Sequence, residues 1–191
     1  MAYQEDKYYI TAVLNGERAA FAKLVNKHKQ TAFNLAFRIT HNREDAEEVV
    51  QDAFVNVYRN LTDFEYKSKF TTWLFRIVYN LSVSKTRRKQ IVQQTIDENI
   101  ADNYFIESTR SDYSLLHDNE RKFYVEKVMD VLDSGDQTIL TLYYQEDCPI
   151  DEIAEITGNS VSNVKVKLFR ARKRLYSELG MLLKDEVSSL L

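Results

Sequence analysis

The stretch 146–179 constrains the fold most, because its pattern is that of two helices joined by a tight turn. The first helix is expected to start at Pro149, whose missing N–H costs nothing at a first helical position. Gly158 follows the apolar face of this helix and suits the left-handed backbone that often ends a helix. Ser160 or Ser162 can cap the next helix by accepting an unpaired backbone N–H. The stretch therefore predicts a helix-turn-helix.

The second helix of this motif combines an apolar side with a strongly basic one. Val164 and Leu168 are expected to pack on the first helix, and no Asp or Glu lies between Ile156 and Ser177. The cations of its other side are Lys165, Lys167, Arg170, Arg172, Lys173 and Arg174. Such a helix can enter the major groove of DNA, with early residues at base edges and later cations on phosphates. The alternative is a solvated basic face on a helical hairpin, but its union with this turn favours DNA binding.

The rest of the chain predicts an all-α fold of two small helical domains joined by a linker. The chain has 191 residues with only 4 Gly and 1 Pro, helix-period patterns dominate it, and no convincing alternating strand is present. Acidic residues and a weaker helical period mark the linker. We expect domains at 1–90 and 119–191, the second holding the helix-turn-helix, with the linker at 91–118. The net charge is −3 although one helix is strongly basic, so the cations are segregated, which suggests both DNA and a basic protein surface as partners.

Several classes of site are not indicated by the sequence. The single cysteine, Cys148, excludes an intramolecular disulfide framework and fits a reducing cytosol. The three histidines and Cys148 show no metal-ligand spacing. No apolar run approaches the length of a membrane span, and the N-terminus does not have the pattern of a signal peptide. We expect a cytoplasmic protein with no metal, no cofactor and no small-molecule substrate.

The N-terminal part of the chain, up to the loop at 61–70, predicts three helices. Residues 4–40 form two of them, broken at Asn15-Gly16, and His28 on the apolar face is interpreted as a packed histidine. Asn42 can cap the third helix. The polar face of that helix carries Glu44, Glu47, Glu48, Gln51, Asp52 and Asn56. This face is either an ordinary solvated surface or a docking surface for a basic partner.

A loop at 61–70 leads into a further helix with a mixed aromatic and basic face. Helical spacing groups on that face Trp73, Arg76, Asn80, Ser84 and Arg87. Lys69, Lys85, Arg88 and Lys89 extend it. Rings on which bases can stack, together with cations for phosphates, suit single-stranded DNA. From the spacing alone Trp73 can equally belong to the core.

Two segments resemble parts of a bacterial sigma factor of the extracytoplasmic-function type. The sequences DAEEVVQDAFVNVYRNL and FTTWLFRIVYNL resemble the family's second domain, and CPIDEIAEITGNSVSNVKVKLFRARKRL resembles its fourth. The resemblance covers nearly the whole chain, including order and spacing. It implies a two-domain helical protein that binds core RNA polymerase, directs it to specific promoters and helps to melt the minus-ten region. The sequence also lacks a nucleotide-binding glycine loop, a catalytic triad signature and a paired acid/base site, so we expect no enzyme.

The resemblance also implies a role for individual residues. Those matching the helix that docks on the polymerase clamp are Asp45, Glu48, Gln51 and Asp52. Those matching the minus-ten surface are Phe64, Lys69, Trp73, Arg76, Asn80, Arg87 and Arg88. Those matching the minus-thirty-five helix are Ser160, Ser162, Asn163, Lys165, Lys167, Phe169, Arg170 and Arg172. The implied partners are core RNA polymerase, promoter DNA and an anti-sigma factor.

Two other functions fit parts of the pattern. A two-domain helix-turn-helix regulator would bind double-stranded DNA without docking on core polymerase. A helical enzyme or adaptor would use the basic helix to bind an acidic protein. Neither function needs a surface for single strands, so the face formed by Trp73, Arg76 and Asn80 favours the sigma factor.

Overall fold

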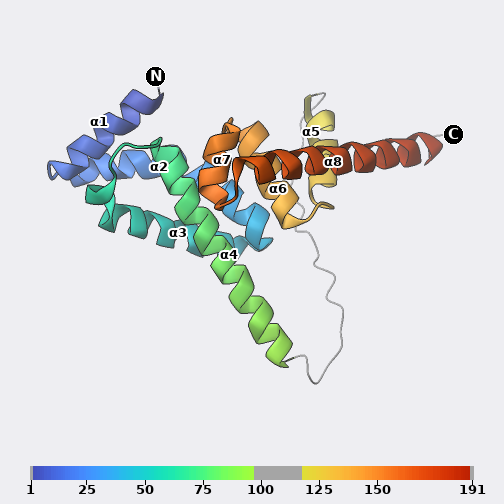
Figure 1. The fold of residues 1–191 in the computed structure, drawn as a ribbon, viewed down its shortest axis with the longest axis horizontal. Helices are drawn as coiled ribbons and strands as arrows, with labels where there is room; N and C mark the ends of the chain where they lie inside the picture. The colour runs from blue at the N-terminus through green and yellow to red at the C-terminus, as the bar shows by residue number, and fades with distance from the viewer. Residues whose placement is uncertain (1, 97–117, 190–191) are drawn as a thin grey trace.

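The computed structural model describes residues 2–96 and 118–189, and within these ranges it contains helices and no strand (Figure 1). The helices are α1 (Ala2–Leu14), α2 (Arg18–Thr40), α3 (Arg43–Arg59), α4 (Phe70–Ile96), α5 (Asp118–Met129), α6 (Ser134–Leu140), α7 (Ile150–Thr157) and α8 (Val161–Ser189). A 3-10 turn, Leu61–Asp63, follows α3, and a π-helical turn, Thr141–Gln145, follows α6. The predicted all-helical class is confirmed. Residues 91–96, expected in the linker, belong to α4, and the expected linker residues 97–117 lie outside the described residues.

The first two helices form a hairpin that turns at Gly16. Its φ of 97° lies where a side chain would be strained, so the break predicted at Asn15-Gly16 is confirmed. Asp6 of α1 joins the two helices, because its Oδ1 lies 3.0 Å from Nε2 of His28. His28 is 6% exposed, and its ring lies 5.3 Å from the ring of Phe70 between centroids. The interpretation of His28 as a packed histidine is therefore confirmed.

Helix α3 packs against both α2 and α4 and begins at the predicted cap. The Oδ1 atom of Asn42 accepts a hydrogen bond of 2.9 Å from the backbone N–H of Asp45. Its buried stripe consists of Ala46, Val49, Ala53, Phe54 and Val57. Because this stripe is fixed in the core, the acidic residues on the other side of α3 face solvent.

The helix-turn-helix is formed by α7 and α8. Pro149 has extended backbone angles and precedes the helix, so α7 begins at Ile150, one residue later than the sequence predicted. Gly158 ends α7 with a left-handed φ of 67°, as expected. Ser160 caps α8, since its Oγ accepts a hydrogen bond of 3.2 Å from the backbone N–H of Asn163. The apolar contact between the two helices includes the buried residues Ile153, Ala154, Ile156, Val164, Leu168 and Ala171.

The N-terminal and C-terminal helices pack together rather than standing apart. Helix α7 lies against α4, and α6 lies against α2 (Figure 1). A single hydrophobic cluster includes Phe70 and Leu74 of α4 together with Ile153 and Ile156 of α7. Helix α7 therefore packs both against α8 and against the N-terminal half of the chain.

Candidate nucleic-acid and polymerase interfaces

Within the described parts of the chain, some carboxylates of α3 form ion pairs with α4 and others do not. Asp45 is 8% exposed and forms ion pairs with Lys85 and Lys89 of α4. The Oε2 atom of Glu48 lies 2.6 Å from Nζ of Lys85, which raises the pKa of Lys85 above its usual value. Gln51 and Asp52 are exposed. The structure thus presents Glu48, Gln51 and Asp52 to solvent, whereas Asp45 also ties α3 to α4.

The loop before α4 folds its aromatic residues inward. Phe64 is 7% exposed, and its ring stacks on Trp73 with centroids 5.1 Å apart and an interplanar angle of 29°. The ring of Tyr66 also contacts Phe64, with centroids 4.8 Å apart and an interplanar angle of 58°. Trp73 itself is half-buried, so it packs on the core and still keeps part of its ring at the surface. Trp73 can therefore belong to the core and also to the face expected to bind single strands.

Polar and basic side chains continue from this aromatic cluster along α4. Arg76, Asn80, Arg87 and Arg88 are all exposed. At the start of the helix, Nζ of Lys69 lies 2.7 Å from Oε1 of Glu152 in α7. The hydrogen bond from Lys69 to Glu152 raises the pKa of Lys69. Of the cations expected on this face, Lys69 pairs with Glu152, and Lys85 and Lys89 pair with acidic residues of α3. Among the described residues no ion pair involves Arg76, Arg87 or Arg88, so that part of the face is open.

The solvent face of α8 holds the residues expected to read DNA. Its exposed members are Ser160, Ser162, Asn163, Lys165, Phe169 and Arg170. Phe169 is 68% exposed, which is unusual for a phenylalanine and places an apolar ring among cations. Lys167 is half-buried, with Nζ 3.3 Å from Oδ1 of Asn159, which also accepts from Asn163. This end of α8 therefore combines hydrogen-bonding groups, cations and one exposed ring.

Comparison with known proteins identifies the family. The sequence profile of sigma-70 region 2 matches residues 24–91, and that of sigma-70 region 4 matches residues 122–175. The chain is 27% identical to the extracytoplasmic-function (ECF) RNA polymerase sigma factor SigW of Bacillus subtilis, over 91% of this chain and 96% of SigW. The chain belongs to the ECF sigma factors. The sigma-H factor of Pseudomonas aeruginosa is 28% identical over 97% of this chain and 99% of that protein.

A solved structure agrees with the fold of this sigma factor. RpoE of Bartonella quintana, crystallised with the anti-sigma factor NepR, matches with a TM-score of 0.67 over 84% of this chain and 96% of RpoE, at 22% identity. As a sigma factor, the chain is a transcription initiation factor that binds core RNA polymerase and directs it to specific promoters. The findings support this function and not the helix-turn-helix regulator that acts without polymerase.

Arg172 of the sigma factor makes contacts that the sequence did not predict. Its guanidinium carbon lies 4.9 Å from the ring centroid of Tyr143 and 5.3 Å from that of Tyr144. The side chain is half-buried, so it also holds α8 against the turn after α6. Helical spacing placed Arg172 correctly on the basic side but could not reveal the two tyrosines, which lie about thirty residues earlier in the chain.

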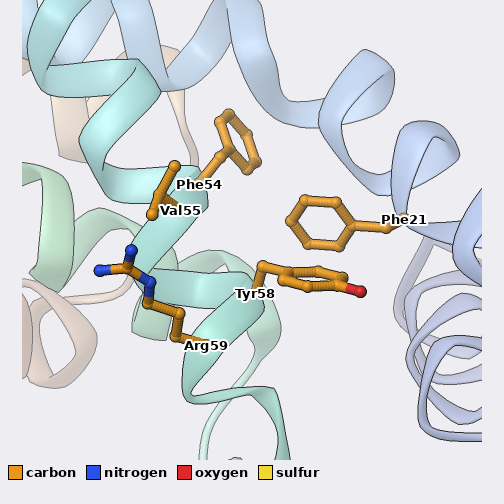
Figure 2. Close-up of a pocket in the computed structure, with 5 residues that line it drawn as sticks. All are labelled: Phe21, Phe54, Val55, Tyr58 and Arg59. Atoms are coloured by element: carbon orange, nitrogen blue, oxygen red, sulfur yellow. The ribbon is translucent and has the colours of Figure 1, made fainter.

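Sequence reasoning also missed an apolar hollow beside the acidic face of the sigma factor. Phe21 of α2 and Phe54, Val55, Tyr58 and Arg59 of α3 line a volume of about 340 Å³ (Figure 2). The rings of Phe21 and Tyr58 meet edge to face with centroids 4.9 Å apart. Tyr58 and Val55 are each nearly half exposed. The signal available in the sequence was that the apolar stripe of α3 is wider than one buried face requires.

Among the described residues, no group of three or more His, Cys, Asp or Glu side chains is arranged to hold a metal ion. Within the same parts of the chain, none of the helices has the length and apolar character needed to cross a membrane.

Proposed function

We propose that the sigma factor uses three separate surfaces, the first being the acidic face of α3. Glu48, Gln51 and Asp52 contact a basic surface of core RNA polymerase, and Asp45 supports them from its ion pairs with α4. The exposure of these side chains on one stable, capped helix supports the assignment. Opposite charges across an interface speed association and fix its orientation more than they add affinity.

The second surface recognises and melts the minus-ten region. Trp73 offers its ring to an unpaired base, the buried ring of Phe64 supports Trp73 from within, and the exposed cations and the amide of α4 bind the strand. These side chains are Lys69, Arg76, Asn80, Arg87 and Arg88. Extruding a base from the duplex costs a few kcal/mol, so stacking must offset that cost. The half-buried Trp73, stacked on Phe64, is the observation that supports this role.

The third surface is the start of α8, which enters the major groove at the minus-thirty-five element. Lys165, Phe169 and Arg170 contact base edges. Lys167 and Arg172, at the edge of this surface, contact phosphates. The hydroxyl and amide groups of Ser160, Ser162 and Asn163 complete this surface. Support comes from the exposure of these residues on a helix held by Gly158 and the α7 contact.

These assignments define the wider proposal for the protein. Residues 1–90 form the domain for polymerase docking and the minus-ten element, 91–118 the linker, and 119–191 the domain for the minus-thirty-five element with a C-terminal tail. The chain works in the cytoplasm, where the polymerase is, and has no enzymatic activity or cofactor of its own. RpoE was solved with an anti-sigma factor, and we extend such a partner to this chain.

Reconstitution tests the proposal directly. The purified chain is mixed with bacterial core RNA polymerase and fragmented genomic DNA from its own organism, and the transcripts are sequenced from their 5′ ends. Discrete starts that share two upstream motifs are expected. Binding of duplex DNA with no binding of core polymerase and no specific starts, beside an active control sigma factor, would contradict it.

A further inference from the structure

Two adjacent residues of α1 connect that helix to Trp73, although α1 carries no residue of the three proposed surfaces. We propose that Lys7 of α1 is a positioning residue of the minus-ten site, which keeps the Trp73 ring where it can stack on an unpaired base. The contacts responsible pass through Tyr66 and Phe64. This inference deepens the proposed minus-ten function and rests on it, since Trp73 is the ring assigned to the base.

The first set of contacts runs through the loop before α4. The Nζ atom of Lys7 lies 5.6 Å from the centroid of the Tyr66 ring, within the range of a cation–π interaction. The Tyr66 ring contacts that of Phe64 with centroids 4.8 Å apart, and Phe64 stacks on Trp73 with centroids 5.1 Å apart. Lys7 is exposed and Phe64 is buried, so these contacts lead from the surface of α1 through the core to Trp73.

A second set of contacts starts at the preceding residue of α1 and ends at the same ring. The Oδ1 atom of Asp6 lies 3.0 Å from Nε2 of His28, and the His28 ring lies 5.3 Å from that of Phe70 between centroids. The Phe70 ring in turn lies 6.2 Å from that of Trp73. Asp6, His28 and Phe70 are all buried, and closely packed side chains have little freedom to move. This set therefore fixes α1 relative to α4, which gives the Lys7 ammonium a defined place beside the loop.

The backbone of Tyr66 shows why the loop needs support from another helix. Its φ of 57° lies in the left-handed region, which is rare for a bulky side chain and costs conformational energy. Such a residue keeps this conformation only where its surroundings hold it, and strain of this kind concentrates at binding sites. The Phe64 ring contacts Tyr66, and the Lys7 ammonium lies over the Tyr66 ring. Without Lys7, the strain favours a second loop conformation in which Phe64 supports Trp73 less well.

A direct contact with a DNA phosphate is the competing role for Lys7. Among the described residues no carboxylate forms an ion pair with its ammonium, so the charge is available to an anion. The contact with Tyr66, however, exists in the free chain without DNA. A positioning residue must affect Trp73 before any DNA is added, whereas a phosphate contact must not. A measurement on the free chain therefore separates the two roles.

Fluorescence of Trp73 provides that measurement, because Trp73 is the single tryptophan of the chain. Selective excitation of tryptophan in the full-length protein therefore reports on this one ring. The emission maximum, the anisotropy and the quenching by acrylamide are compared between the wild type and Lys7→Gln. Lys23→Gln is the matched control, because it removes the same charge from an exposed position of α2 in the same half of the chain.

We expect Lys7→Gln to expose Trp73 to solvent, with red-shifted emission and stronger quenching, while Lys23→Gln matches the wild type. Lys7→Arg should restore the wild-type signal, since a guanidinium also interacts favourably with a ring face. Tyr66→Leu should change the signal at least as much as Lys7→Gln, and Tyr66→Phe should not change it. Adding Lys7→Gln to Tyr66→Leu should have no further effect, because Lys7 acts through the ring. The melting temperature of Lys7→Gln should stay close to that of Lys23→Gln, which separates positioning from unfolding of α1.

The consequence for transcription is measured with reconstituted polymerase on a promoter that the sigma factor recognises. Lys7→Gln should lower the rate of open-complex formation about two- to five-fold, the range that corresponds to a cation–π contact at an exposed site. Formation of the closed complex and affinity for core polymerase should not change, since α1 belongs to neither of those proposed surfaces.

Three results would overturn the proposal. Unchanged Trp73 fluorescence in Lys7→Gln would exclude positioning, even with slower open-complex formation, because Lys7 would then contact DNA directly. An equal change in Lys23→Gln would make the effect one of net charge. A changed signal with an unchanged rate of open-complex formation would show that the position of Trp73 does not limit melting. The fluorescence of the free chain needs neither DNA nor polymerase, so failure of the proposed minus-ten function would appear only in the reconstitution.

Discussion

Charge reversal at Asp52 tests the acidic face of α3 most cleanly. Among the residues that the structure describes, no cation forms an ion pair with Asp52, whereas Glu48 lies 2.6 Å from the Lys85 ammonium. Glu48 must give up Lys85 before it contacts a basic partner, but the charge of Asp52 is available at once. We therefore expect Asp52→Asn to weaken binding of core polymerase more than Glu48→Gln does.

The size of the effect follows from the exposure of the site. An exposed ion pair contributes about 0.2–1 kcal/mol, and Asp52→Lys replaces this attraction by a repulsion of similar size. The loss is then about 0.4–2 kcal/mol, which is roughly a 2- to 30-fold increase in Kd. The effect should shrink as salt is raised, because exposed charges are screened.

Equilibrium titration of labelled sigma factor with core polymerase at several salt concentrations measures these values. Glu17→Lys is the control, since Glu17 is an exposed acid of the same half of the chain but lies in the turn before α2. An Asp52→Lys variant that binds as tightly as the wild type at low salt would remove α3 from the polymerase interface. If Glu17→Lys weakened polymerase binding equally, the effect of Asp52→Lys would come from the net charge of the chain and not from the acidic face of α3.

Three further outcomes are expected. Trp73→Ala should slow formation of the open promoter complex roughly ten-fold while leaving closed-complex binding nearly unchanged, because stacking contributes about 1–3 kcal/mol per base; permanganate footprinting separates the two steps, and equal defects would make Trp73 structural. Gly158→Ala should lower the melting temperature, since its φ of 67° strains a side chain, whereas Gly180→Ala inside α8 should not; calorimetry compares them. Burial raises the pKa of Asp6, but His28 and the neighbouring lysine outweigh burial and hold it below its usual value. This stabilisation is present above the unfolded pKa of about 3.9 and is lost as the pH falls through the folded pKa, so the difference in unfolding free energy between wild type and Asp6→Asn should shrink on acidification.

Local features of the fold were predictable because they depend on neighbouring residues. The caps at Asn42 and Ser160 and the turn at Gly158 each involve groups within four positions of one another. The helical period likewise identified which side of α3 and α8 would be buried. These signals lie within single helices, so a sequence contains them whatever the helices later pack against.

Contacts between distant residues could not be predicted in the same way. Thr72 and Glu152 are eighty positions apart, and nothing in the period of either helix indicates that they meet. The stacking of Arg172 on Tyr143 also depends on how the turn after α6 approaches α8. Periodicity assigns a residue to a face, but the partner of that face is decided by the packing of whole helices.

The charged residues that the sequence assigns to partners are partly paired with each other in the free chain. Asp45 and Glu48 neutralise Lys85, and Glu152 neutralises Lys69. Docking on polymerase or DNA must therefore exchange one ion pair for another at these positions, and each exchange yields less free energy than a new pair in isolation. Arg76 and Asp52 form no ion pair with any described residue, so they should contribute more to affinity per residue than Lys69 and Glu48. The internal pairs therefore lower the affinity of each surface for its partner.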